Sequence, residues 1–259
     1  MRTKNIFNSI VSIGTYKAFI DEIISYGRAK TPSYVCFANV HMVVEAYHDE
    51  SFQKLINEAN IIAPDGKPLS AFLRLSEGIK QDRVCGMDIM PDLLKQAETA
   101  GESVYFYGST DELLKKITQK AKAEFPALKI SGYYSPPFRM LSKKEDARIT
   151  KKIREANPDL VFVSLGCPKQ EKWMAEHKDK LNACLLGLGQ AFRTYAGVEK
   201  RLPKWMRDLS LEWAYRFIQE PGRLWKRYMY SNSVFLFLVF RHIIFQFFQK
   251  HFHLHHRVT

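Results

Sequence analysis

Short apolar runs of strand length alternate with stretches of helical periodicity along most of the chain. The apolar runs cover residues 34–40, 61–64, 103–109, 160–166 and 183–189. Amphipathic helical periodicity occupies stretches between them, namely residues 87–100, 110–125 and 145–156. Strands that alternate with helices in this way are typical of a parallel sheet with helices on both faces. The pattern therefore predicts an α/β fold with a doubly wound sheet.

The last quarter of the chain has a different composition. From Lys200 onward it contains eleven Lys or Arg residues against three acidic ones, which supplies +8 of the formal net charge of +12. An amphipathic helical pattern covers residues 203–219, Pro221 interrupts it, and a further helical stretch follows. We therefore predict two parts, an α/β domain over residues 1–197 and a basic, aromatic-rich helical appendage over residues 198–259.

The final helical stretch is apolar around most of its circumference. From Val234 to about His253 polar side chains recur on one stripe, and phenylalanine, leucine, valine and isoleucine surround it. Arg241 and His242 interrupt the apolar run, which we expect to fall short of the roughly 20 residues that a membrane-spanning helix needs. The pattern favours a helix in the interface of an anionic membrane. A terminal helix that packs on the core, or on a second subunit of a homo-oligomer, fits the same pattern.

Cysteine and histidine spacing favours neither disulfides nor a metal site. The four cysteines stand singly, with no CxxC pair, and "HFHLHH" near the C-terminus has no carboxylate or cysteine nearby to complete a site. The N-terminal sequence lacks the continuous apolar segment of a signal peptide. We therefore expect a protein of the reducing cytosol that uses no metal or other cofactor.

The stretch "IIAPDGKPLSAFL" allows two interpretations of Asp65. Asp-Gly is a common turn dipeptide, so Asp65 fits the role of a turn former. A hairpin fits poorly, because Pro64 and Pro68 flank the pair and cannot donate to a ladder. A strand, a loop and a helix that begins near Pro68 fit better. That arrangement places Asp65 at the carboxyl end of a strand, where parallel sheets bind their ligands.

Glycines end several predicted strands, and arginines gather in the appendage. Gly108, Gly187 and Gly189 would let backbone N–H groups approach a phosphate or sugar closely, although each also fits ordinary strand-to-helix punctuation. No D-x-D metal-binding motif occurs in the chain. Arginine side chains would then have to neutralise the charge of a departing diphosphate. Three arginines in the last quarter of the chain are close enough in sequence to converge there: Arg216, Arg223 and Arg227. These features suggest a nucleotide-diphosphate site.

Five sequence blocks in one order carry a resemblance to a known family. They are "FANVHMVVEAYHDESFQKLINEANIIAPDGKPL", "RVCGMDIM", "VFVSLGCPKQEKWM", "GLGQAF…AG" and "RLPKWMRDLSLEWAYRFIQEPGRLWKRY". The chain resembles the WecG/TagA/CpsF glycosyltransferases, and "SPPFR" makes it similar to the GumM-like branch. The resemblance implies a Rossmann-like GT-E fold and inverting transfer from a UDP-sugar to an undecaprenyl-diphosphate-linked saccharide. It also implies a peripheral enzyme on the cytoplasmic face of the cell membrane, with an appendage that helps to close the site.

The resemblance also implies roles for individual residues. Asp65 matches the family's proposed catalytic base, Asn39 a site asparagine and Gln170 the glutamine beside the donor pocket. The three late arginines match those implicated around the diphosphate. From the residues alone, Asn39 also fits a strand-end cap and Gln170 a simple helix-start residue.

Two positions depart from the family pattern. Phe37 stands where many members have threonine, and Arg193 stands where many have aspartate. A phenylalanine cannot replace the hydrogen bond of a threonine hydroxyl, and arginine for aspartate reverses a charge. We expect these changes to affect donor choice or the details of the pocket.

Two other functions fit parts of the sequence. A basic nucleic-acid-binding α/β protein would use the interleaved aromatic and basic residues of the appendage. However, no recognised binding module is visible, and an apolar terminal stripe has no use on a polyanion. A regulator that binds a UDP-sugar without turnover fits the same residues as the enzyme. We expect the enzyme, with a UDP-sugar and a lipid-linked acceptor as substrates, an anionic membrane surface as partner, and no nucleic acid.

Overall fold

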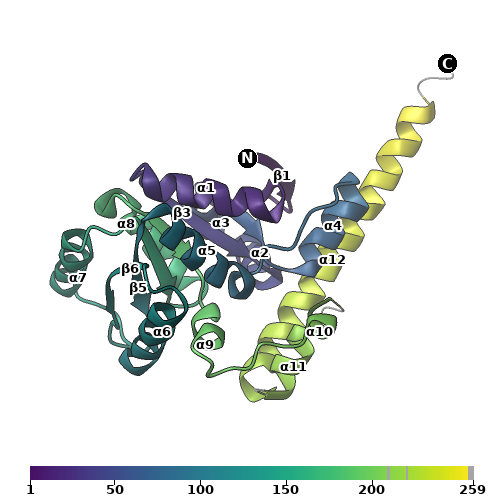
Figure 1. The fold of residues 1–259 in the computed structure, drawn as a ribbon. Coiled ribbons are helices and arrows are strands. Elements are labelled where there is room, and N and C mark those ends of the chain that lie inside the picture. Colours follow the sequence, from purple (N-terminus) through teal and green to yellow (C-terminus); the bar gives the residue numbers. More distant parts are fainter. Residues whose placement is uncertain (209–210, 220, 256–259) are drawn as a thin grey trace.

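The structure, a computed structural model, describes residues 1–208, 211–219 and 221–255. Its centre is a six-stranded parallel sheet with the strand order β4-β3-β8-β7-β5-β6 (Figure 1). The strands are β3 (Ser33–Ala38), β4 (Ile61–Pro64), β5 (Ser103–Gly108), β6 (Lys129–Tyr134), β7 (Leu160–Ser164) and β8 (Cys184–Gly187). The α/β fold class expected from the sequence is confirmed. The sequence pattern did not reveal β6, an edge strand of intermediate burial.

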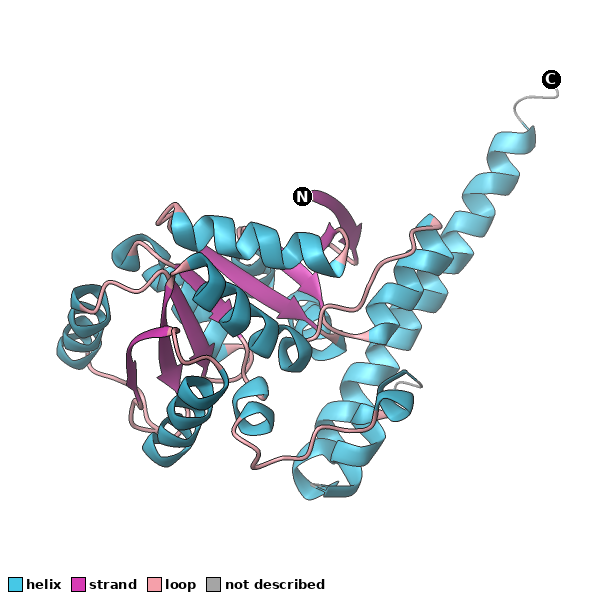
Figure 2. Cartoon of the chain, in the orientation of Figure 1, coloured by secondary structure: helices cyan, strands magenta, loops and turns pink. Residues whose placement is uncertain are grey.

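Helices cover both faces of the sheet (Figure 2). One face carries α1 (Tyr16–Arg28), α5 (Gly86–Ala100), α6 (Asp111–Glu124) and α9 (Ala191–Tyr195). The other carries α2 (Val40–His48), α3 (Glu50–Asn57), α4 (Lys67–Glu77), α7 (Lys143–Glu155) and α8 (Lys169–Leu181). Successive residues of β3 alternate between the two cores, so that Cys36 packs on one face and Phe37 on the other. Because both faces are covered, the strands at the centre of the sheet are mostly apolar.

An antiparallel hairpin that the sequence pattern did not reveal precedes α1. Strands β1 (Arg2–Ile6) and β2 (Ser9–Ile13) flank a turn at Phe7 and Asn8, both of which have positive φ. The hydroxyl of Ser12 accepts a hydrogen bond of 3.0 Å from the backbone N–H of Ile62 in β4. The hairpin therefore satisfies a backbone donor of an edge strand and protects that edge.

The appendage consists of α10 (Lys204–Asp208), α11 (Glu212–Gln219) and α12 (Pro221–His255). The single helix expected over residues 203–219 is wrong, because α10 ends at Asp208 and α11 begins at Glu212. Helix α12 begins at Pro221, a position where the missing N–H of proline costs little. In Figure 1 this long yellow helix runs beside α4 and continues past the α/β domain.

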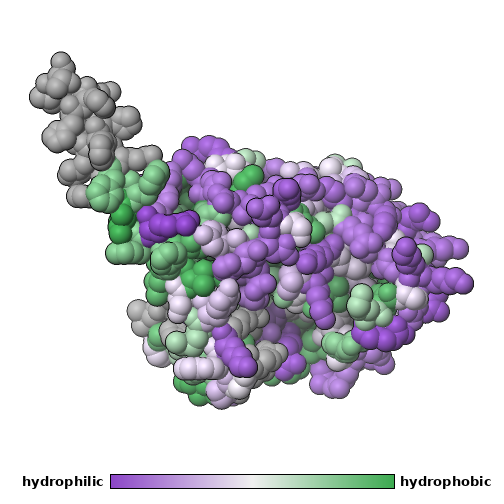
Figure 3. All heavy atoms as spheres, turned by 180° about the vertical axis from the view of Figure 1, so that it is seen from behind, coloured by the Kyte–Doolittle hydropathy of each residue, from purple (hydrophilic) through white to green (hydrophobic). Residues whose placement is uncertain are grey.

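Helix α12 packs on the α/β domain through a side that combines the polar residues His242 and Gln246 with buried apolar residues such as Leu238. Phe235 is buried, and the His242 ring lies 5.1 Å from the Phe72 ring, between centroids. Gln246 Nε2 donates a hydrogen bond of 3.4 Å to a backbone carbonyl of α4. The apolar side of the helix is exposed instead, through Leu236, Phe237, Phe240, Ile243, Ile244, Phe245 and Phe248. Figure 3 shows hydrophobic residues gathered on this side, whereas the opposite end is mostly hydrophilic.

By length and composition alone, residues Leu224–Gln246 of α12 are sufficient to cross a membrane. The expectation of an apolar run too short to span is therefore wrong in length, since this segment has 23 residues. Arg241, which was expected to interrupt the run, turns back to α2, where its guanidinium lies 5.8 Å from the centre of the Tyr47 ring. The terminal helix both packs on the core and presents an apolar surface.

Candidate active site

The predicted site residues of the α/β domain meet at the carboxyl edge of the sheet. Asp65 follows β4 directly, and its backbone N–H donates to the carbonyl of Ala38 at the end of β3, at 2.8 Å. Helix α4 then begins at Lys67 with a proline in its first turn. The strand, loop and helix expected around Asp65 are confirmed. Because the strands are parallel, Asn39 and the glycines after β5 and β8 lie at the same edge.

Asp65 is half-buried beside the segment that leads into α5. The backbone N–H of Val84 donates to the carbonyl of Pro64 at 2.9 Å, which holds that segment against the end of β4. The Cys85 thiol forms a hydrogen bond with Asp65. Burial, followed by the charge of Asp65, raises the pKa of Cys85 well above its ordinary value. The thiol therefore keeps its proton and can donate it to the carboxylate in this hydrogen bond.

Asn39 is the N-cap of α2. Its Oδ1 accepts a hydrogen bond of 3.2 Å from the backbone N–H of Met42, which satisfies one of the first N–H groups of the helix. The strand-end cap considered in the sequence is therefore present. Capping uses the oxygen of the amide, so the Nδ2 group is the part of Asn39 that is suited to a ligand acceptor.

Gln170 is buried and joins the loop after β7 to the end of β8. Its Nε2 donates to the carbonyl of Gly187 at 3.0 Å and to Glu171 Oε1 at 2.9 Å, and its Oε1 accepts from the N–H of Gly166 at 3.2 Å. Both amide hydrogens are thus engaged inside the protein. A Cβ on Gly187 would lie 3.1 Å from Gln170 Nε2, so this glycine makes room for the side chain.

Gly108 is required by the packing of two strand ends. Its φ is +106°, and a Cβ at this position would lie 2.3 Å from the carbonyl oxygen of Ser164. The Ser164 hydroxyl in turn donates to the carbonyl of Gly189 at 2.9 Å. The loops after β5, β7 and β8 are therefore tied to one another, which gives the edge a fixed backbone surface.

The arginines that the sequence suggested lie on the appendage helices. Arg216 belongs to α11, whereas Arg223 and Arg227 belong to the first two turns of α12. Their side chains are outside the part of the chain that the structure describes. Their role at a diphosphate stays a prediction.

Sequence reasoning missed a different group of arginines. Arg83, Arg201 and Arg207 all contact Asp88, in the first turn of α5. A cavity of about 520 Å³ opens beside this cluster and has Asp88, Arg201 and Arg207 in its wall. The blocks "RVCGMDIM" and "RLPKWMR" contain all four residues, but their spacing does not show that they meet.

The two departures from the family pattern have local structural partners. Phe37 is buried in the core between the sheet and the helices α1 and α5. Arg193 Nε lies 2.5 Å from Glu199 Oε1, and the Gln190 amide donates to the other oxygen of this carboxylate. The charge of Arg193 is thus matched within the chain, at the point where the appendage begins.

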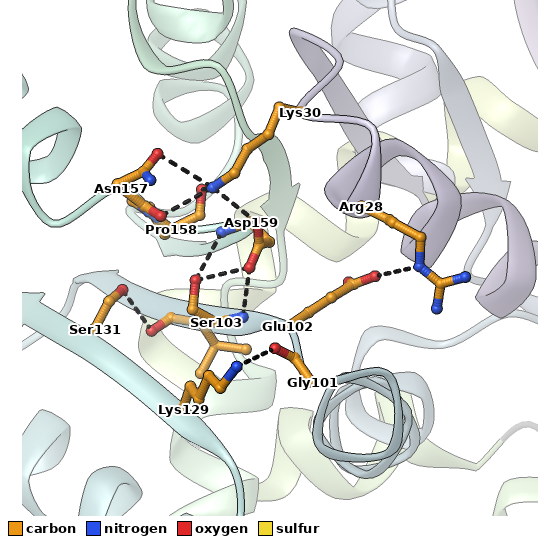
Figure 4. A network of polar contacts seen from close by, with 11 residues as sticks. Arg28, Lys30, Gly101, Glu102, Ser103, Lys129, Ser131, Asn157, Pro158 and Asp159 are labelled. Carbon is orange, nitrogen blue, oxygen red and sulfur yellow. Dashed lines mark hydrogen bonds and ion pairs between the residues drawn. The ribbon is translucent and has the colours of Figure 1, made fainter.

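A network of ion pairs and hydrogen bonds lies at the opposite edge of the sheet, where the parallel strands begin (Figure 4). Lys30 Nζ lies 2.8 Å from Asp159 Oδ1, and Asp159 Oδ2 accepts from the N–H and the hydroxyl of Ser103 at 2.6 and 2.8 Å. Arg28 Nε lies 3.5 Å from the buried Glu102. These residues fasten α1 to the starts of β5 and β7, away from Asp65.

One group of described residues has metal-ligand types close together: Asp146, Glu176 and His177, with their ligand atoms within 4.8 Å of one another. His177 Nδ1 lies 2.8 Å from the Trp173 carbonyl and Nε2 lies 3.0 Å from Asp146 Oδ2. Both ring nitrogens thus face acceptors of the protein, and the histidine joins α7 to α8 as a structural pair.

The chain is similar in sequence to enzymes of one family, and the sequence model of the glycosyl transferase WecG/TagA/CpsF family matches residues 4–248. An N-acetylglucosaminyldiphosphoundecaprenol N-acetyl-beta-D-mannosaminyltransferase of Bacillus subtilis (strain 168) is 32% identical over 229 residues, which cover 88% of this chain and 87% of that enzyme. An enzyme of the same name from Staphylococcus aureus (strain MW2) is 28% identical and covers 79% of this chain and 78% of its own length. Since the family match spans nearly the whole sequence, the chain belongs to the WecG/TagA/CpsF family of glycosyltransferases.

Proposed function

We propose that the chain transfers a sugar, with inversion, from a UDP-sugar to an undecaprenyl-diphosphate-linked saccharide in cell-surface polysaccharide synthesis. The observation that carries the proposal is the position of Asp65 at the carboxyl edge of the parallel sheet, next to Asn39. Open α/β sheets bind nucleotides at this edge. The acceptor class follows from the relatives, whose names specify N-acetylglucosaminyldiphosphoundecaprenol.

Asp65 acts as the general base in this reaction. The acceptor hydroxyl attacks the anomeric carbon while the bond to UDP breaks, and the hydroxyl proton passes to a carboxylate oxygen of Asp65. Negative charge grows on the departing UDP, and guanidinium groups of Arg83 and of the appendage are suited to stabilise it. Since the sequence contains no D-x-D motif, we propose that the arginines perform this task without a divalent metal.

Replacement of Asp65 by Asn tests the role of base. Asparagine has the same shape but cannot take up the proton, so turnover should fall by about 10³-fold. The affinity for UDP, measured by calorimetry, should stay within about threefold, since in the proposed reaction Asp65 acts on the acceptor hydroxyl and not on the diphosphate. Product should be identified by mass after a screen of UDP-sugars with a short-chain prenyl-diphosphate acceptor and a chelator.

The matched control is Asp82→Asn, a carboxylate on the same connecting segment that accepts from the backbone N–H of Tyr16 at 3.2 Å. It should turn over normally. Normal turnover by Asp65→Asn, with donor still bound, would contradict the role of base. UDP-sugar binding by the wild-type chain without product from any donor would favour the non-catalytic regulator.

We also propose that the enzyme works as a peripheral protein on the cytoplasmic face of the cell membrane. The support is the exposed apolar side of α12, which includes Phe240 and Phe245 at 64% and 59% exposure. The side of this helix that contains His242 and Gln246 packs on the α/β domain, so the exposed apolar side is available for lipid. Basic residues of the appendage suit anionic headgroups.

The double variant Phe240→Ser/Phe245→Ser tests the membrane contact by vesicle sedimentation. Loss of two rings that the proposal places in lipid should weaken binding to anionic vesicles by more than about tenfold. Phe138→Ser is the matched control, because Phe138 is also exposed but follows β6, at the other end of the sheet from β4. Unchanged partition of the double variant would overturn the proposal. Competition by a single-stranded oligonucleotide would favour the nucleic-acid-binding alternative.

A further inference from the structure

Asp88 is the meeting point of three guanidinium groups. Arg83 Nη2 lies 2.9 Å from its Oδ2, and Arg207 Nη1 lies 2.8 Å from its Oδ1. Arg201 contacts the same Oδ1 through Nη2 and, at 3.2 Å, through Nε. Both carboxylate oxygens therefore accept charge-assisted hydrogen bonds, the strongest class of hydrogen bond in proteins.

These three arginines come from two different parts of the chain. Arg83 directly precedes Val84, whose N–H is bonded to the strand end that carries Asp65. Arg201 and Arg207 belong to the start of the appendage, before and within α10. Asp88 itself stands on α5, one turn from Cys85, which is bonded to Asp65. A single carboxylate thus joins the segment around the base to the appendage.

The electrostatics keep Asp88 ionised. Burial alone would raise the pKa of Asp88, but hydrogen bonds and charges of Arg201 and Arg83 outweigh it and lower the pKa below its ordinary value. Like charges repel at these short separations, and the carboxylate between the guanidinium groups offsets that repulsion. The arrangement of the three arginines consequently depends on the charge of Asp88.

We propose that Asp88 is a positioning residue for sugar transfer, which docks the appendage and aligns its arginines with Arg83 at the carboxyl edge. The inference rests on the proposed function, because it assumes that the reaction takes place at Asp65. Asp88 does not touch the reacting atoms. It acts through the arginines, so that the appendage helices reach the site in a fixed arrangement before substrate arrives.

Asp88→Asn tests the docking in the enzyme without substrate. Asparagine preserves the size of the side chain and removes its charge, so hydrogen–deuterium exchange over residues 198–208 should rise by about tenfold or more. Asp92→Asn is the matched control, one turn further along α5, where the carboxylate accepts a hydrogen bond of 2.7 Å from the Tyr16 hydroxyl. Its exchange over residues 198–208 should equal that of the wild type. Equal exchange in Asp88→Asn would overturn the proposal.

A kinetic cycle tests whether Asp88 acts through the arginines. Asp88→Asn and Arg207→Ala should each lower kcat by about tenfold, and the double variant should lose no more than either single variant. Arg207 lies outside the α/β core, so its variant tests the contact independently of core folding. Multiplicative losses would refute the coupling. The exchange experiment needs no turnover, so a failure of the Asp65 assay remains distinct from a failure of this inference.

Discussion

Glu102, at the amino edge of the sheet, should make the stability of the fold depend on pH. This residue is 4% exposed, and its carboxyl group lies near the carboxylate of Asp159 (Figure 4). Burial, with a smaller contribution from the charge of Asp159, raises the pKa of Glu102 from 4.5 to about 7, and Arg28 offsets only part of this effect. The native state therefore holds a proton that the unfolded chain has already lost over this interval.

The sign and the size of the effect follow from linkage. Where the native state binds more protons than the unfolded state, the free energy of unfolding falls as the pH rises. The loss begins above pH 4.5 and is complete a little above pH 7, where Glu102 is ionised in both states. A difference in pKa of this width corresponds to a loss of about 3 kcal/mol in the free energy of unfolding. Because the Arg28 side chain is 68% exposed, solvent screens the charges around Glu102, and we expect a measured loss of about 2 kcal/mol.

Glu102→Gln removes this titration, so the difference in unfolding free energy between variant and wild type should grow by about 2 kcal/mol from pH 4.5 to pH 8. Urea unfolding followed by circular dichroism at five pH values gives the difference curve, in which other titrating groups cancel. Glu155→Gln, which removes one carboxylate from the exposed side of α7, is the matched control for the loss of a charge. A flat curve for Glu102→Gln would refute the assignment of a raised pKa to this carboxyl group.

Two further predictions concern the carboxyl edge and the start of the appendage. Gly108→Ala should lower the free energy of unfolding by about 3 kcal/mol, because the positive φ and the overlap with Ser164 act together. Gly78→Ala, where φ is also positive but the surrounding space is open, should lower it by about 1 kcal/mol. Equal shifts of the melting temperature in the two variants would contradict the packing argument. Arg193→Asp should lower the free energy of unfolding by breaking the ion pair with Glu199, and the added change Glu199→Arg should restore about 0.5–1 kcal/mol of it. Additive effects of the two changes on urea unfolding would contradict the pairing.

The strands of the sheet centre were predictable because their signal is local. Each is a run of apolar residues buried on both faces, and β4 even has the predicted bounds of residues 61–64. The two strands missed at the start of the chain lack a continuous apolar run, because β1 is mostly polar and serines interrupt the buried β2. Strand β1 is almost entirely exposed, and the turn at Phe7 and Asn8 has no glycine to indicate the positive φ that it adopts. Edge elements depend on what covers them, which composition does not encode.

The orientation of α12 shows why an amphipathic pattern is only half of a prediction. The sequence shows a polar stripe and an apolar remainder, and the usual rule would turn the apolar side to the core. Here Phe235, Leu238 and His242 are on the side that packs on the domain, and a second apolar side of the helix is left exposed. Periodicity gives the two sides of a helix, whereas the surface that it meets decides which side is turned inward.

The same distinction separates the predictable from the unpredictable part of the site. The position of Asp65 at the carboxyl edge was predictable because a strand end and the flanking prolines are features of one short stretch, and the parallel sheet brings all such ends to one edge. The contacts of Arg201 and Arg207 with Asp88 join positions 113 and 119 residues apart, so no local pattern reports them. Gln170 presents the intermediate case: its position at the edge was predictable, but its bonds to Gly187 and Gly166 depend on the approach of two loops. In a site of this kind the sequence identifies the groups that strand ends carry, and long-range packing determines how their neighbours are aligned.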